Sequence, residues 1–245
     1  MFFSSSKVSA AASYTLCSGS TSAATATAQT GTASGGLPGG MGGQCPGSSD
    51  GGQQPSGSMP PQGGMFSDVS AGSWYDQAAR YVSRMGLMSG TGNGTFSPDT
   101  AVTRGMLVTI LYRLDGAPEV SGGCPFSDVP SGGYYETAAA WAAANGIVSG
   151  YGDGRFAPGQ AVTREELAAI LYRYAQYKGY DLSASADLTG FSDQAAISSF
   201  ARPAMSWAKA SGLMDGNDTG ALAPKGAAAR AQMAMILTRL CEKAV

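Results

Sequence analysis

Histidine is absent from the 245 residues of this chain. Its absence excludes Ser-His-Asp and Cys-His nucleophiles, zinc or haem held by histidine, and a histidine proton shuttle. Charged residues make up only 13% of the chain, the net charge is −2, and no run of Lys or Arg occurs that could attract nucleic acid. No apolar run approaches the roughly 20 residues that a membrane-spanning helix needs. We therefore expect neither a nucleic-acid partner nor a membrane span.

Cysteine is scarce and its spacing matches no metal site. The gaps between the four residues are 28, 79 and 117, and none is a C-x-x-C pair. Four unrelated thiols are one interpretation, and a disulfide between the third and fourth is the other. The four positions are Cys17, Cys45, Cys124 and Cys241. The stretch Asp215–Gly220 starts like a calcium loop, but Gly226 stands where such a loop needs a Glu. We expect no metal and no cofactor.

The first 65 residues differ in composition from the rest of the chain. They hold only two charged side chains, Lys7 and Asp50, and 14 of the 36 glycines. Such a segment cannot bury enough apolar surface to offset the entropy of ordering it, which predicts a low-complexity linker over 1–65. The Ser/Thr/Ala run at 10–32 leaves open that this is the end of a lost upstream domain. Without a convincing signal peptide, we expect either a missing signal or a C-terminal piece of a longer chain.

Three copies of one sequence pattern fill the chain after residue 65. Phe66-Ser67-Asp68 recurs as Phe126-Ser127-Asp128 and Phe191-Ser192-Asp193, at offsets of 60 and 65 residues. A Gly-containing stretch, a Pro-containing turn and an apolar run follow in the same order in each copy. We assign the repeats to 66–120, 121–185 and 186–245.

Each repeat is predicted to form two helices joined by a glycine-rich turn. In the second repeat, Tyr135, Ala138 and Ala142 lie at helical spacing, and Gly146 stands where a helix would end. The next helix opens with Thr163 as N-cap and Glu166 three residues later, a complete capping box. The first repeat keeps half of that box, and the third has Ala229 at the cap position. One such hairpin exposes too much apolar surface to stand alone, so an all-α bundle of three hairpins is predicted.

This pattern resembles the S-layer homology domain family. The elements that carry the resemblance are the Phe-x-Asp start, the Gly-rich stretch 146–156, the Pro that follows it, and the Thr-Arg-x-Glu box. The resemblance covers 66–241 in three copies. It implies a pseudo-trimeric bundle that attaches an extracellular protein non-covalently to a secondary cell-wall polysaccharide bearing pyruvate ketals. It also implies a location at the cell wall or S-layer, with other S-layer proteins as further candidate partners.

The resemblance implies that the Arg of the Thr-Arg-x-Glu box meets the acidic group of the polymer, in grooves between neighbouring repeats. The corresponding residues are Arg104, Arg164 and Arg230. An Arg at the first position of a helix lies beside unpaired backbone N–H groups, which suits a carboxylate ligand. Replacing all three with Ala is expected to abolish wall binding while the helices persist. The complete capping box predicts that Arg164 contributes most.

Two further sets of repeated residues are candidate sugar contacts. One set follows the Phe of each repeat, and its carboxylates could instead cap or turn the chain before the first helix: Asp68, Asp128 and Asp193. The other set is aromatic and could stack on a pyranose ring or lie in the core: Tyr81, Trp141 and Trp207.

Three classes of function compete at this stage: a polysaccharide-binding anchor, a structural or protein-interaction module without sugar binding, and an enzyme. The visible catalytic candidates are the adjacent carboxylates Glu165 and Glu166. Neighbouring helical residues point about 100° apart, so this pair cannot flank one scissile bond. We therefore expect no enzyme activity from this chain and favour the anchor.

Overall fold

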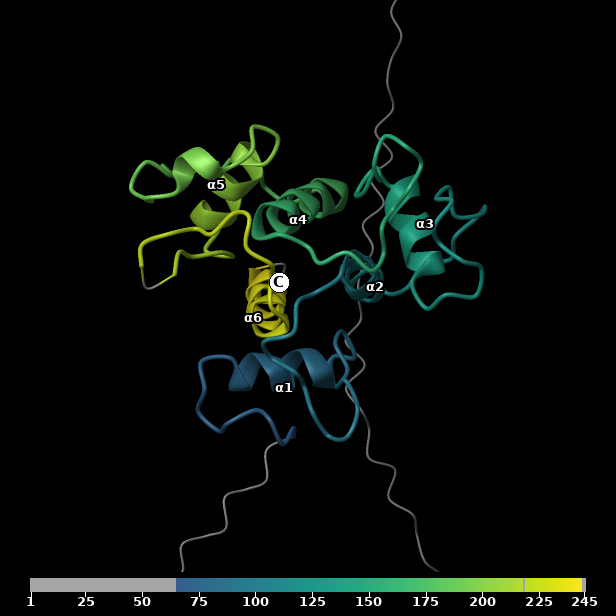
Figure 1. Ribbon diagram of the computed structural model, residues 1–245, viewed down its shortest axis with the longest axis horizontal. Helices are drawn as coiled ribbons and strands as arrows, with labels where there is room; N and C mark the ends of the chain where they lie inside the picture. The colour runs from purple at the N-terminus through teal and green to yellow at the C-terminus, as the bar shows by residue number, and fades with distance from the viewer. Residues whose placement is uncertain (1–64, 218, 244–245) are drawn as a thin grey trace, which may run out of the picture. The chain divides into compact units, whose positions relative to one another are not determined.

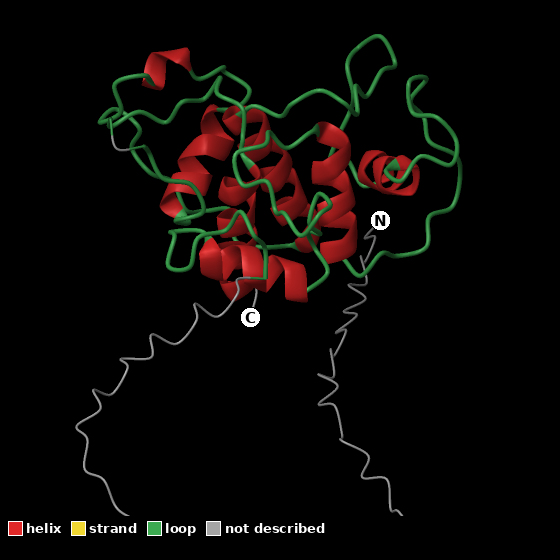
Figure 2. Cartoon of the chain, turned by 60° about the horizontal axis from the view of Figure 1, so that its bottom comes forward, coloured by secondary structure: helices red, strands yellow, loops and turns green. Residues whose placement is uncertain are grey.

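The computed structural model describes residues 65–217 and 219–243, and within them every regular element is a helix (Figure 2). The expectations for 1–65 fall, apart from Met65, outside the described residues. The six α-helices are α1 (Asp76–Arg84), α2 (Arg104–Leu114), α3 (Glu136–Ala144), α4 (Arg164–Lys178), α5 (Arg202–Ala210) and α6 (Arg230–Lys243). A short 3₁₀ helix, η1 (Gln194–Ala196), precedes α5. The predicted all-α class with three repeats is confirmed.

The helix starts follow the predicted capping chemistry. In α4 the Thr163 hydroxyl accepts the N–H of Glu166 at 3.3 Å, and the Glu166 carboxylate accepts the N–H of Thr163 at 2.9 Å. In α2 only the first of these bonds exists, from Met106 to Thr103. In α6 only the second exists, because Gln232 accepts the N–H of Ala229 while alanine offers no oxygen. The capping residues in the sequence therefore indicate where α2, α4 and α6 begin.

Helix packing runs between repeats, which the sequence does not reveal. The second helix of each repeat packs against the first helix of the next: α2 against α3, α4 against α5, and α6 back against α1 (Figure 1). The small residues Ala138, Ala139 and Ala142 are almost fully buried and let α3 approach closely. Each of the three helix pairs is therefore built from two repeats, and the last pair closes the cycle.

A ring of backbone hydrogen bonds joins the three segments that precede α2, α4 and α6. Val102 donates its N–H to the Ala228 carbonyl at 2.8 Å, and Ala228 donates to the Val162 carbonyl at 2.9 Å. Val162 donates to the Val102 carbonyl at 2.9 Å, which closes the ring. Val102, Val162 and Ala228 are all buried, so these bonds form out of water. The ring fixes the starts of α2, α4 and α6 relative to one another. We call these three the inner helices, and α1, α3 and α5 the outer helices.

Cys124 and Cys241 are free thiols, so the disulfide interpretation is not what the structure adopts. Cys17 and Cys45 lie outside the described residues. None of the helices in 65–217 and 219–243 has the length and apolar character to cross a bilayer.

Candidate functional site

The three helix-start arginines lie at the junctions between repeats. Arg104, Arg164 and Arg230 are the first residues of α2, α4 and α6, and they are between 6% and 9% exposed. Each donates its Nε–H to a carbonyl in the turn of the next repeat. The acceptors are the carbonyls of Phe156 for Arg104 (2.7 Å), Leu222 for Arg164 (2.7 Å) and Phe96 for Arg230 (2.8 Å).

The buried guanidinium groups have no carboxylate partner. Among the described residues, no Asp or Glu oxygen lies within ion-pair distance of Arg104, Arg164 or Arg230. Burial lowers the pKa of Arg164 and Arg230, although more distant carboxylates oppose this by favouring the charged form. A buried cation without a counter-ion is costly, and an anionic ligand would relieve that cost.

The backbone N–H groups at these helix starts are not free, which corrects the sequence interpretation. In α2 the N–H of Arg104 donates to the carbonyl of Gln160, and that of Gly105 donates to Pro158, both at 2.9 Å. The first two N–H groups of α4 and α6 are used in the same way by the turn of the next repeat. The side chains, and not the helix ends, are therefore the groups that can bind a ligand.

Two of the junctions open into hollows on the surface. The hollow at Arg104 has a volume of about 170 Å³ and is also lined by Tyr151, Glu166 and Arg173. The hollow at Arg164 has a volume of about 580 Å³. Its other lining residues include Asp215, Asn217, Gln232 and Arg239. We call these the Arg104 groove and the Arg164 groove, and the equivalent junction of repeats 3 and 1 the Arg230 groove.

A second arginine in each repeat was missed by the sequence analysis. Arg173 and Arg239 line the two hollows, and Arg113 is their counterpart in α2. Each lies nine residues after the helix-start Arg of its own repeat. This constant spacing in all three copies is the signal that could have identified them. Because neighbouring repeats meet, one groove combines the helix-start Arg of one repeat with the second Arg of the next.

The aromatic candidates need correcting. Trp141 is 2% and Trp207 3% exposed, so neither offers a ring face to a sugar, and Tyr81 is half-buried. Trp141 packs against Tyr112 of α2, with ring centroids 5.6 Å apart. Trp207 packs in the same way on Tyr172 of α4. These rings join the outer helices to the inner helices of the preceding repeat.

A different set of aromatics is exposed beside the grooves. One residue at the same position of each repeat, just before the first helix, is 58–65% exposed: Trp74, Tyr134 and Phe200. Trp74 lines the Arg164 groove and Phe200 lines the Arg104 groove. The Arg104 and Arg164 grooves therefore each draw on three repeats, because this aromatic comes from the repeat that supplies neither arginine.

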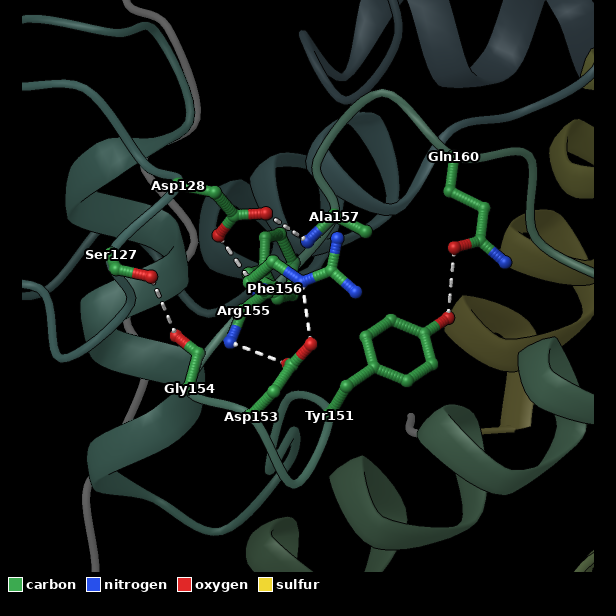
Figure 3. Close-up of polar contacts among 9 residues, drawn as sticks. All are labelled: Ser127, Asp128, Tyr151, Asp153, Gly154, Arg155, Phe156, Ala157 and Gln160. Atoms are coloured by element: carbon green, nitrogen blue, oxygen red, sulfur yellow. Dashed lines mark hydrogen bonds and ion pairs between the residues drawn. The ribbon is translucent and has the colours of Figure 1, made fainter.

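The three aspartates hold the turns that the arginines contact. Asp128 accepts the N–H groups of Phe156 and Ala157, both at 2.7 Å (Figure 3). Ala157 has a φ of +56°, a conformation that costs a non-glycine residue energy and needs such support. The same two bonds recur for the other two aspartates, Asp68 and Asp193. Since both carboxylate oxygens are engaged with a turn 28–30 residues later, these aspartates position the turn and do not cap the first helix.

Glycine is required where each turn passes the Phe ring. A Cβ on Gly150 would lie 2.6 Å from Cε1 of Phe126. A Cβ on the equivalent glycines would lie 3.0 Å from the Phe66 ring at Gly90 and 2.7 Å from the Phe191 ring at Gly216.

We expect Asp128→Asn to lower stability in a pH-dependent way. Burial disfavours the charged carboxylate, but the N–H groups of Phe156 and Ala157 outweigh burial, so the pKa of Asp128 lies below its usual value. The stabilisation is therefore complete above the unfolded pKa of about 4 and is lost as pH falls towards the folded pKa. Thermal unfolding of both proteins between pH 7 and pH 2 should show a deficit for Asp128→Asn that shrinks below about pH 4. Asp99→Asn, at an exposed position, is the control, and a deficit independent of pH would contradict the assignment.

The adjacent carboxylates Glu165 and Glu166 have separate partners. Glu165 is buried, and its carboxylate accepts hydrogen bonds from the N–H and the hydroxyl of Ser198. It also forms an ion pair with Lys225 at 2.5 Å. Glu166 belongs to the capping box. The stretch Asp215–Gly220, which starts like a calcium loop, contains residue 218, and this residue lies outside the described part of the chain. Asp215 itself pairs with two cations, Lys209 and Arg239.

Comparison with known proteins agrees with this repeated architecture. The model of the S-layer homology domain matches residues 66–105, 125–168 and 190–234. An endoglucanase of Bacillus sp. (strain KSM-635) is 35% identical over 73% of this chain, which covers 19% of that protein. A surface-layer 125 kDa protein of Lysinibacillus sphaericus is 28% identical over 68% of the chain and 14% of its own length. A cellulosome-anchoring protein of Acetivibrio thermocellus is 29% identical over 38% of the chain and 22% of its own length. The chain thus spans less than a quarter of each of these relatives.

Proposed function

The chain belongs to the S-layer homology domain family, and from that premise we propose that it anchors an extracellular protein non-covalently to the bacterial cell wall. The ligand in this proposal is an acidic secondary cell-wall polysaccharide, in particular one that carries pyruvate ketals. The family and its surface-layer relatives place the chain at the cell wall or S-layer.

The observation that carries the proposal is the set of buried arginines without counter-ions. Arg104 and Arg164 each border a hollow, and Nε of each guanidinium is held by a carbonyl. With Nε engaged, the outer edge of the guanidinium is oriented before a ligand arrives, which reduces the entropy lost on binding. A carboxylate on a sugar matches this edge in charge and in geometry.

The second arginines and the exposed aromatics extend the same surface. Arg173 adds a second cation to the Arg104 groove, and Phe200 adds an apolar ring. A pyruvate ketal presents a carboxylate next to a pyranose ring, so it needs a cation beside an apolar face. The Arg104 groove offers both within one hollow.

The hydrolase names among the relatives are not carried to this chain. The endoglucanase shares 178 aligned residues, which cover 19% of its length. The family shown for this chain is the S-layer homology domain, whose model matches residues 66–105, 125–168 and 190–234. We propose a non-catalytic module, and a screen of the full chain against glycoside substrates tests this point.

Sedimentation with purified cell-wall sacculi tests the anchoring function. The full chain should co-sediment with sacculi that retain the secondary polymer and remain in the supernatant when that polymer has been removed. Removing only the ketal groups by mild acid should weaken the binding if the carboxylate is the recognised group. Equal sedimentation with stripped sacculi would contradict the proposal. It would favour the alternative, a structural or protein-interaction module that includes other S-layer proteins as partners.

A further inference from the structure

Residue 215 sets the Arg164 groove apart from its two counterparts. The residue before the tightly packed glycine is Ser89 in the first repeat, Ser149 in the second and Asp215 in the third. Its main-chain carbonyl contacts the groove directly, since that of Asp215 accepts the Nη2–H of Arg164 at 2.8 Å. Ser89 accepts from Arg230 in the same way at 2.6 Å. In the Arg164 groove, a carboxylate therefore stands where the other two grooves have a serine hydroxyl.

The carboxylate of Asp215 is ion-paired with Arg239, the second arginine of the Arg164 groove. Oδ2 of Asp215 lies 3.2 Å from Nη1 of Arg239, and Oδ1 lies 2.8 Å from Nζ of Lys209. The counterparts of Arg239 are Arg113 and Arg173, and in the described part of the chain neither has a carboxylate within 4 Å. Lys209 is also particular to the third repeat, because Ser83 and Ala143 stand at its position in the others.

We propose that Asp215 acts as an internal anion that makes the Arg164 groove select an uncharged sugar unit, while the other two grooves take the acidic unit. This rests on the proposed function. An acidic ligand in the Arg164 groove would have to displace Asp215 from Arg239 and then remain beside a like charge. The other lining groups suit a neutral sugar, because Trp74 offers an exposed ring and Asn217 and Gln232 carry uncharged amides.

The carboxylate of Glu166 in the Arg104 groove does not act in the same way. Its Oε2 accepts the N–H of Thr163 at 2.9 Å and lies at the positive end of α4, so it leaves Arg173 unoccupied. In the Arg230 groove, Met106 replaces Glu166 and Ser89 replaces Asp215, so neither position carries a charge. Glu166 of the α4 capping box thus lines the Arg104 groove, so the capping box does not raise the affinity of Arg164 for an acidic ligand. Acid affinity should therefore be highest at Arg230 and lowest at Arg164.

A site-resolved titration tests the proposal on the full chain. The probes are a methyl glycoside that carries one pyruvate ketal and the uncharged methyl ester of the same compound. The Nε–H groups of Arg104, Arg164 and Arg230 are hydrogen-bonded and buried, so their NMR signals should be visible and report each groove separately. Single Arg→Lys variants assign the signals. The acid should bind at Arg164 at least about tenfold more weakly than at Arg104 and Arg230, whereas the ester should bind there at least as tightly as elsewhere.

Two variants separate charge from shape. Asp215→Ser restores the residue of the other repeats, and Asp215→Asn removes the charge while keeping the size. Both should bring the acid affinity at Arg164 to within about threefold of that at Arg104. Equal acid affinity at all three grooves of the unaltered chain would overturn the proposal. So would Asp215→Ser and Asp215→Asn variants that stay folded by circular dichroism but gain no acid affinity at Arg164. Either result would leave the anchoring function standing. Failure of every groove to bind either probe, together with failure to bind sacculi, would overturn both.

Discussion

A chain that ends at residue 185 is expected not to fold cooperatively, although it keeps two complete repeats. The shortened chain lacks α5 and α6, so α4 loses its partner α5 and α1 loses its partner α6. Only the α2–α3 pair remains. It also removes Ala228 and opens the ring of backbone hydrogen bonds. The buried residues of α1 and α4 would lose their partners. A domain is usually stable by only about 5–15 kcal/mol, so little cooperative structure should remain.

Urea unfolding followed by circular dichroism measures this effect. The full chain should unfold in one transition, and the chain 1–185 should show a broad, weak transition or none. The matched control is removal of the first 64 residues, which leaves all three helix pairs intact and should keep the midpoint of the full chain. A cooperative transition of 1–185 at the original midpoint would show that the repeats fold independently.

The helices and their starts were predictable because they depend on local chemistry. The Thr163–Glu166 box and the alanine stripe of α3 act within one or two helical turns, and both appear as predicted. Pairing of helices between repeats was not predictable in this way. A single repeat contains the same apolar faces whether they meet within that repeat or in the next one.

The candidate site was predicted in part, and the missing part has a physical explanation. Repetition identified Arg104, Arg164 and Arg230, and the structure places all three at the junctions between repeats, with a hollow beside Arg104 and another beside Arg164. Burial of Trp141 and exposure of Trp74 could not be told apart from sequence, because both are aromatics repeated at the same spacing. Which of them is exposed depends on which helix of the neighbouring repeat covers it. The second arginines could have been found from their constant spacing of nine residues.

The structure also changes what the helix-start arginines can test. Each guanidinium bonds a carbonyl at a buried junction, so replacing it with Ala leaves that acceptor unpaired at a cost of about 1–3 kcal/mol. Three such losses approach the whole stability of a domain. The expectation that a triple Ala variant keeps its helices is therefore revised: binding and fold should be lost together. A clean test of ligand binding needs cations that the fold does not use.

Arg113 and Arg173 meet that need, and replacing both with Gln is expected to reduce retention on sacculi at least about tenfold. Both side chains are exposed, and in the described residues neither forms an ion pair. Arg113 donates only a long bond of 3.4 Å to the Leu87 carbonyl. Their loss should therefore change the free energy of unfolding by less than about 0.5 kcal/mol per site. In the Arg104 and Arg230 grooves the change removes one of the two arginines, whereas the Arg164 groove keeps both.

The matched control is replacement of Arg84 and Arg202 with Gln, because both are exposed arginines outside the grooves. This pair removes the same net charge and should leave retention unchanged. Adding Arg239→Gln to the Arg113/Arg173 variant should cause little further loss of acid binding, since that guanidinium is already paired with Asp215. Sedimentation at several salt concentrations measures all four proteins, and removing cations from the binding site should reduce the salt dependence. Unchanged retention of the Arg113/Arg173 variant would show that the helix-start arginines bind the polymer without them.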